Sequence, residues 1–151
     1  MSWVTLTEAK FLQHCTGAET TAIKSAALAT GQGEPLTDTL ARVVQEVRGY
    51  VAAHAQNTLG EGATVPQELE AAAIAIARFR ALNRLPTKSL LTDTRVQEYR
   101  DALAQLRDVA AGRFALEQPA SQSAQVIPGG GAVEVASSTT RKATREKLSG
   151  L

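Results

Sequence analysis

The sequence is poor in cysteine, in aromatic residues and in net charge. Its single cysteine, Cys15, excludes an intramolecular disulfide framework, and we expect a buried, inert thiol because the residue ends an apolar helical pattern. A net charge of +1 gives no overall bias toward nucleic acid, membranes or acidic substrates. Aromatic residues make up only 4% of the chain, whereas alanine, the strongest helix former, is abundant. This composition favours close-packed helices over sheets.

Long apolar runs are also missing. No stretch approaches the roughly 18 apolar residues that span a bilayer, and no basic segment followed by an apolar one resembles a signal peptide. We therefore expect a protein without a membrane partner, made in a reducing cytoplasm or in a particle assembled there. A chain of 151 residues is long enough for one domain with its own core.

Apolar periodicity and breaker residues predict five helices, over residues 6–15, 18–29, 38–57, 66–84 and 93–111. Thr5 lies three residues before Glu8, a spacing that predicts a capping box at the start of the first helix, and Gly17 is expected to end that helix. Thr37 or Asp38 can cap the third. Pro66 suits the first position of the fourth, where its missing N–H is not needed.

The last two predicted helices have contrasting patterns. The fourth is apolar around nearly its whole circumference over residues 71–77, which places it in the middle of a bundle. The fifth has a regular amphipathic stripe, an N-cap at Thr92 or Asp93 and a terminating Gly112; its apolar positions are Val96, Tyr99, Leu103, Leu106 and Ala110. We therefore predict an all-α fold, a small bundle of about five helices formed by residues 1–116.

The composition changes near Pro119. Residues 117–151 are rich in Ser, Thr, Gln and Gly, and such a segment buries too little apolar surface to offset its ordering entropy. We expect an extended C-terminal tail that is flexible or is ordered by a partner. Two apolar patches and a basic group are its candidate partner-binding residues: Val126, Ile127, Val133, Val135, Arg141, Lys142, Arg145 and Lys147.

No arrangement of side chains in the sequence is typical of an enzyme. His14 and His54 lack a cluster of further metal ligands, and the glycine-rich stretches lack the Lys-Ser/Thr pair of a phosphate-binding loop. No serine has the sequence context of a nucleophile elbow. We therefore expect a protein that is not an enzyme and that has no catalytic, metal-binding or cofactor-binding residues.

One basic group stands out near the end of the fourth predicted helix: Arg78, Arg80, Arg84 and Lys88. These residues can pair with acidic residues such as Glu98 and Asp101, or with a neighbouring subunit. Alternatively they form a positive rim that faces phosphates, although no aromatic residues alternate with them for stacking on single strands. We expect these side chains to face a subunit interface or a DNA channel rather than a substrate pocket.

The order of these segments resembles the Mu-like head–tail adaptor (connector) proteins of bacteriophages. The similarity covers residues 4–116 and rests on a pattern of apolar positions. It includes the start over residues 4–8, Tyr50 in the third helix, the proline-initiated apolar helix over 65–79, and the last helix over 99–112 followed by Leu116.

The resemblance implies a structural connector in the neck of a tailed phage virion, assembled in the host cytoplasm. It implies a homo-oligomeric ring of about twelve subunits that lies beneath the portal protein. The ring would bind the portal protein on one side and a neck (stopper) or tail-terminator protein on the other. DNA would pass through the lumen without sequence-specific contacts. Two other functions are compatible with the residues: a small helical nucleic-acid-binding regulator with a basic C-terminal arm, and an accessory subunit of an enzyme.

Overall fold

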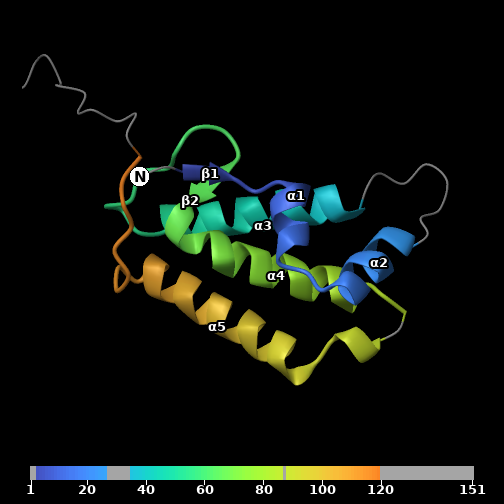
Figure 1. The fold of residues 1–151 in the computed structure, drawn as a ribbon. Coiled ribbons are helices and arrows are strands. Elements are labelled where there is room, and N and C mark those ends of the chain that lie inside the picture. The colour runs from blue at the N-terminus through green and yellow to red at the C-terminus, as the bar shows by residue number, and fades with distance from the viewer. Residues whose placement is uncertain (1–2, 27–34, 87, 120–151) are drawn as a thin grey trace, which may run out of the picture.

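A computed structural model describes residues 3–26, 35–86 and 88–119 of the chain. Five α-helices dominate the described residues, which confirms the all-α class, and a two-stranded sheet accompanies them (Figure 1). In chain order the elements are β1 (Trp3–Thr5), α1 (Glu8–Gln13), α2 (Gly17–Ser25), α3 (Pro35–Ala52), β2 (Thr64–Pro66), α4 (Glu70–Asn83) and α5 (Asp93–Ala110). Short 3₁₀ turns precede α4 at Gln67–Leu69 and α5 at Lys88–Leu90.

Helix α4 lies at the centre of the fold, between α3 and α5 (Figure 1). The sequence predicted this position from the apolar run over residues 71–77. Most of the helix is buried, through Ala72, Ala73, Ile74, Ile76, Ala77, Arg78, Ala81 and Leu82. The small alanine side chains let the two neighbouring helices approach α4 closely. Leu106 and Val109 of α5 and Val43 and Val47 of α3 are fully buried in the same core.

Helix α5 has the bounds that its local signals predict. The hydroxyl oxygen of Thr92 accepts a hydrogen bond from the backbone N–H of Arg95, which caps the first turn. At the other end Gly112 has a φ of 72°, and the N–H of Arg113 donates to the carbonyl of Asp108 at 2.8 Å. These contacts form a Schellman motif, in which glycine tolerates the left-handed conformation. Leu106 is fully buried, whereas Leu103 is only partly buried.

The sheet was not expected from the sequence. β1 pairs with β2 in antiparallel fashion, with Trp3 opposite Pro66 and Thr5 opposite Thr64. The predicted capping role of Thr5 and helical role of Pro66 are therefore wrong. Both residues lie in strands that pair with each other, although the two segments are some sixty residues apart in the sequence. Local sequence signals do not reveal a pairing over such a distance. The N-cap of α1 is Thr7, whose side chain accepts from the N–H of Lys10 at 3.3 Å.

An arginine and a tryptophan anchor the sheet to α3. Arg48 of α3 donates to the carbonyls of Thr64 at 2.8 Å and Gly60 at 3.0 Å, and its guanidinium lies 5.8 Å from the centre of the Trp3 ring. Trp3 packs so tightly on Gly60 that a Cβ there would lie 2.5 Å from the ring. Gly60 is therefore required by the close contact between the N-terminal strand and the loop before β2.

Several other helix ends differ from the prediction. Gly17, expected to end the first helix, is the first residue of α2, because Thr16 caps a new helix there. α2 ends at Ser25 rather than near residue 29, and residues 27–29 lie outside the described residues. α3 begins at Pro35, where a proline suits the first turn, and ends at Ala52 rather than near residue 57.

The first residues of the predicted tail pack on the helical domain. Pro119 is buried, as is Leu116 just before the tail, and the side-chain oxygen of Gln118 accepts a hydrogen bond from the backbone N–H of Thr58 at 2.8 Å. The backbone N–H of Glu117 donates to Glu68 at 3.2 Å. The partner-binding residues predicted for the tail lie outside the described residues: Val126, Ile127, Val133, Val135, Arg141, Lys142, Arg145 and Lys147.

Candidate interaction site

The four basic residues near the end of α4 do not form one patch. Arg78 is only 8% exposed and lies inside the chain. Arg80 is half-buried and forms an ion pair with Glu46 of α3. Arg84 is exposed, with one long hydrogen bond of 3.5 Å to the carbonyl of Pro35, and the exposed Lys88 contacts Asn83. Arg84 and Lys88 are therefore the two members of the group that a partner can reach.

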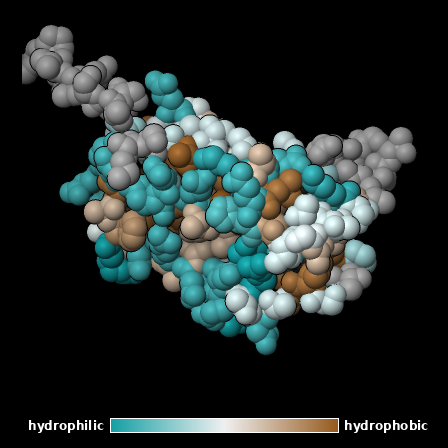
Figure 2. Space-filling view, in the orientation of Figure 1, coloured by the Kyte–Doolittle hydropathy of each residue, from teal (hydrophilic) through white to brown (hydrophobic). Residues whose placement is uncertain are grey.

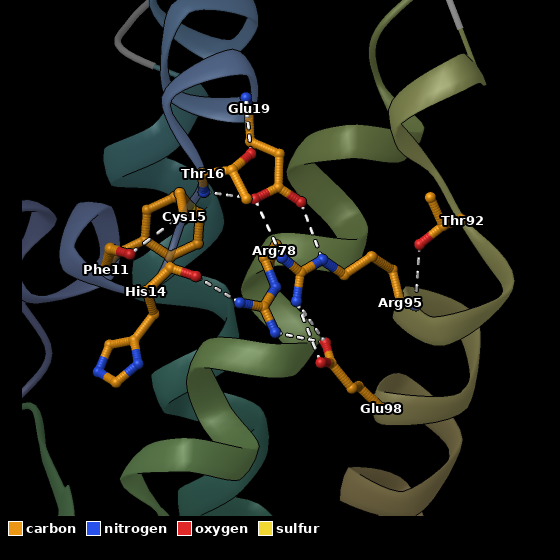
Figure 3. Close-up of polar contacts among 9 residues, drawn as sticks. All are labelled: Phe11, His14, Cys15, Thr16, Glu19, Arg78, Thr92, Arg95 and Glu98. Atoms are coloured by element: carbon orange, nitrogen blue, oxygen red, sulfur yellow. Dashed lines mark hydrogen bonds and ion pairs between the residues drawn. The ribbon is translucent and has the colours of Figure 1, made fainter.

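Arg78 belongs to a network of charged residues between α2, α4 and α5 (Figure 3). Its guanidinium donates to the backbone carbonyl of His14 and to the carboxylate of Glu98. The pairing with Glu98 is one that the sequence analysis anticipated. Arg95 donates to both oxygens of Glu98 at 3.0 Å and to both oxygens of Glu19, at 2.9 and 3.2 Å. Two arginines and two glutamates thus neutralise one another where three helices meet.

Helix caps position the members of this network. Thr16 and Glu19 form a capping box, in which the carboxylate of Glu19 accepts from the N–H of Thr16 at 2.7 Å and the hydroxyl oxygen of Thr16 accepts from the N–H of Glu19 at 3.3 Å. Thr92 caps α5 and places Arg95 and Glu98 in its first two turns. The residues that cap α2 and α5 therefore also place the charged side chains of these two helices close together.

The network shifts the pKa values of Glu19 and Arg95. Burial alone raises the pKa of Glu19, but hydrogen bonds from Thr16 and Arg95 and the positive charge of Arg95 outweigh burial and lower it below its usual range. Burial also opposes the charge of Arg95, yet hydrogen bonds to Glu19 and Glu98 raise its pKa. Both groups are therefore charged at neutral pH.

Cys15 lies beside this network. The cysteine is half-buried rather than fully buried as expected, and its thiol donates to the carbonyl of Phe11 at 3.6 Å. Burial and the nearby charge of Glu19 raise its pKa, although Arg78 and Arg95 act in the opposite direction. A thiol with a raised pKa is less reactive.

Two members of the network, Glu19 and Arg95, were not found from the sequence. They are separated by 76 positions, and no local pattern reports a contact over such a distance. One signal was present: Thr16 and Glu19 have the Thr-x-x-Glu spacing of a capping box, as Thr5 and Glu8 do. The structure places a capping box at the second pair and not at the first.

A groove of about 520 Å³ lies near the exposed end of α4. Apolar residues from three helices line it, namely Ile23 of α2, Leu36 of α3 and Ala81 of α4. Charged lining residues are Lys24 and Arg84, together with Glu8.

The surface seen in Figure 2 is mainly hydrophilic, with separate hydrophobic patches between charged and polar residues. On α5, Arg100 and Arg107 are exposed one heptad apart. The neighbouring acidic residues have partners within the chain, because Asp101 accepts from Gln97 and Asp108 from Arg113. The sequence analysis did not single out these two arginines.

The described residues contain no group of three or more His, Cys, Asp and Glu side chains that could hold a metal ion. His54 lies instead against Gly112, where an added Cβ would meet its ring at 2.5 Å. Within the part of the chain that the structure describes, no helix combines the length and the hydropathy of a membrane-spanning segment.

Comparison with known proteins gives one match. A sequence model of the family described as Bacteriophage Mu, Gp36 matches residues 6–135, which is most of the chain. Searches of curated proteins and of solved structures give no match.

Proposed function

The chain belongs to the bacteriophage Mu Gp36 family, and from this membership we propose that it is a structural head–tail connector of a tailed phage. In this proposal it forms a closed homo-oligomeric ring, of about twelve subunits, in the neck of the virion. One face of the ring binds the portal protein and the other binds a stopper or tail-terminator protein. DNA passes through the lumen, and the protein has no catalytic activity or cofactor.

The family match over residues 6–135 is the observation that carries this proposal. The pattern of apolar positions over residues 4–116, which resembles that of the Mu-like adaptors, supports it. The central α4, packed between α3 and α5, gives the chain a helical core, as suits an assembly part. Thr92 and Gly112 cap the two ends of α5.

The positions of the basic residues refine which of them can serve an interface or a channel. Arg78 is taken up by His14 and Glu98 inside the chain, so it does not reach a neighbouring subunit or DNA. Arg84 and Lys88 are exposed and have no carboxylate partner among the described residues. We assign to these two the contacts with a neighbouring subunit or with passing DNA.

The mass of the purified full-length chain in solution tests the proposal. A connector forms a closed ring, alone or when its portal is added, and does not retard short DNA fragments in a sequence-dependent manner. A nucleic-acid-binding regulator is instead a monomer or dimer that shifts the mobility of DNA. A monomer or dimer that binds DNA and ignores the portal would overturn the connector proposal in favour of the regulator.

A further inference from the structure

Helix α2 is held in the fold differently from its neighbour α1. Phe11 anchors α1 and is fully buried in the core. In α2, Glu19 is the only buried residue of Gly17–Ser25, and Ile23 is only partly buried against the core. A helix of nine residues is too short to be stable alone in water, and α2 gains little from apolar burial. Its position therefore depends on polar contacts.

One carboxylate supplies most of these polar contacts. Glu19 accepts from the backbone N–H of Thr16 at 2.7 Å, which caps α2, and from the guanidinium of Arg95, which attaches α2 to α5. The side chain of Glu19 is 4% exposed and that of Arg95 is 18% exposed. The two oxygens of Glu19 meet two nitrogens of Arg95, an arrangement that any well-placed carboxylate can form with a guanidinium.

Open space lies beside α2 at two places. The groove of about 520 Å³ is lined in part by Ile23 and Lys24. A second, shallow depression lies at the surface between Glu19 and the segment that leads into α5, where Leu90 and Arg95 line it. Helices α4 and α5 pack directly against each other, so their mutual contacts do not require α2.

We propose that α2 is a latch that opens as a unit, and that Glu19 is an internal ligand in a carboxylate-binding site formed by Arg95. Glu98, which also accepts a hydrogen bond from Arg78, holds Arg95 from the other side, so the site persists when α2 leaves. An acidic side chain of another protein can then replace Glu19. This proposal rests on the network and on the sparse apolar burial of α2, and it does not depend on the connector function.

Hydrogen exchange of the full-length wild type, followed by mass spectrometry, tests the latch. Amides of α2 exchange at least tenfold faster than those of α4 and α5, because α2 opens without global unfolding. Glu19→Gln accelerates exchange in α2 by a further tenfold or more and leaves α4 unchanged. Glu46→Gln, which breaks the Arg80 ion pair, is the matched control and leaves α2 unchanged. Equal protection of α2 and α4, lost together in denaturant, would overturn the latch.

Acetate, used as a small carboxylate probe, tests the binding site. In Glu19→Ala the site of Arg95 is vacant, so acetate raises the melting temperature of this variant more than chloride does at the same ionic strength. The double variant Glu19→Ala/Arg95→Gln shows no such difference, and neither does the wild type, whose site Glu19 fills. An equal response to acetate and chloride in Glu19→Ala would rule out the carboxylate-binding site.

Discussion

Glu19 in α2 and Arg95 in α5 share two hydrogen bonds, from Nε to Oε1 at 2.9 Å and from Nη2 to Oε2 at 3.2 Å. The two residues are 76 positions apart, so their contact joins the N-terminal part of the chain to its last described helix. Around them, Arg78 and Glu98 complete a network without net charge (Figure 3).

The stability that Glu19 contributes depends on pH. Its pKa is lower in the folded chain than the ordinary value of 4.5, so the folded state favours the charged carboxylate. This contribution is complete above the ordinary pKa and is lost as the pH falls through the lowered, folded-state pKa. The charged group that faces Glu19 is Arg95, and the thiol of Cys15 lies nearby.

We therefore expect Glu19→Gln to lower the free energy of unfolding at pH 7 by about 1–3 kcal/mol, the cost of leaving a buried partner unsatisfied. Urea unfolding at pH 7 and pH 3 measures this. The difference between wild type and variant narrows at pH 3, because wild-type Glu19 is then increasingly protonated. A difference that is the same at both pH values would show that Glu19 is not held charged by Arg95.

Two leucines of α5 make a matched pair for packing. Leu106 is fully buried, and we expect Leu106→Ala to cost about 2–5 kcal/mol of unfolding free energy. Leu103 is only partly buried, so Leu103→Ala loses less apolar burial and costs about 1–2 kcal/mol. Chemical denaturation of both variants tests the orientation of α5. The reverse ranking would mean that α5 presents a different face to the core.

Substitution by alanine is expected to change the stability in opposite directions at two glycines. Gly49 lies within α3 with open space around its Cα, so Gly49→Ala raises stability by up to about 1 kcal/mol through helix propensity. Gly60 packs against the Trp3 ring, so Gly60→Ala forces the N-terminal strand away and lowers the melting temperature. Tryptophan fluorescence reports this displacement directly. An unchanged spectrum and melting temperature for Gly60→Ala would contradict the contact.

The exposed basic residues at the end of α4 provide a test of the proposed subunit or DNA contacts. We expect Arg84→Gln/Lys88→Gln to reduce ring formation or genome retention while the monomer keeps its melting temperature, since neither side chain is buried. Arg42→Gln is the control, because Arg42 is also exposed and pairs with Asp38 of its own helix. If the double variant forms normal rings and heads that retain DNA, Arg84 and Lys88 do not make the proposed contacts.

Features set by local interactions could be predicted from the sequence, whereas features set by contacts between distant segments could not. α5 was predicted with nearly its observed bounds because Thr92 and Gly112 act on their own helix. Thr5 and Pro66 were misassigned because a strand pairing between distant segments determines their conformation. For the same reason the contact between Glu19 and Arg95 was missed. Arg78 was singled out for its charge, but its burial follows from α4 being central.

The connector proposal is tested most directly by electron microscopy of the full-length chain co-expressed with the portal protein of the same phage. The account predicts a closed ring of about twelve subunits seated coaxially on the portal, with an open central channel. Portal particles without added density, together with a chain that stays monomeric or dimeric in the same sample, would contradict it.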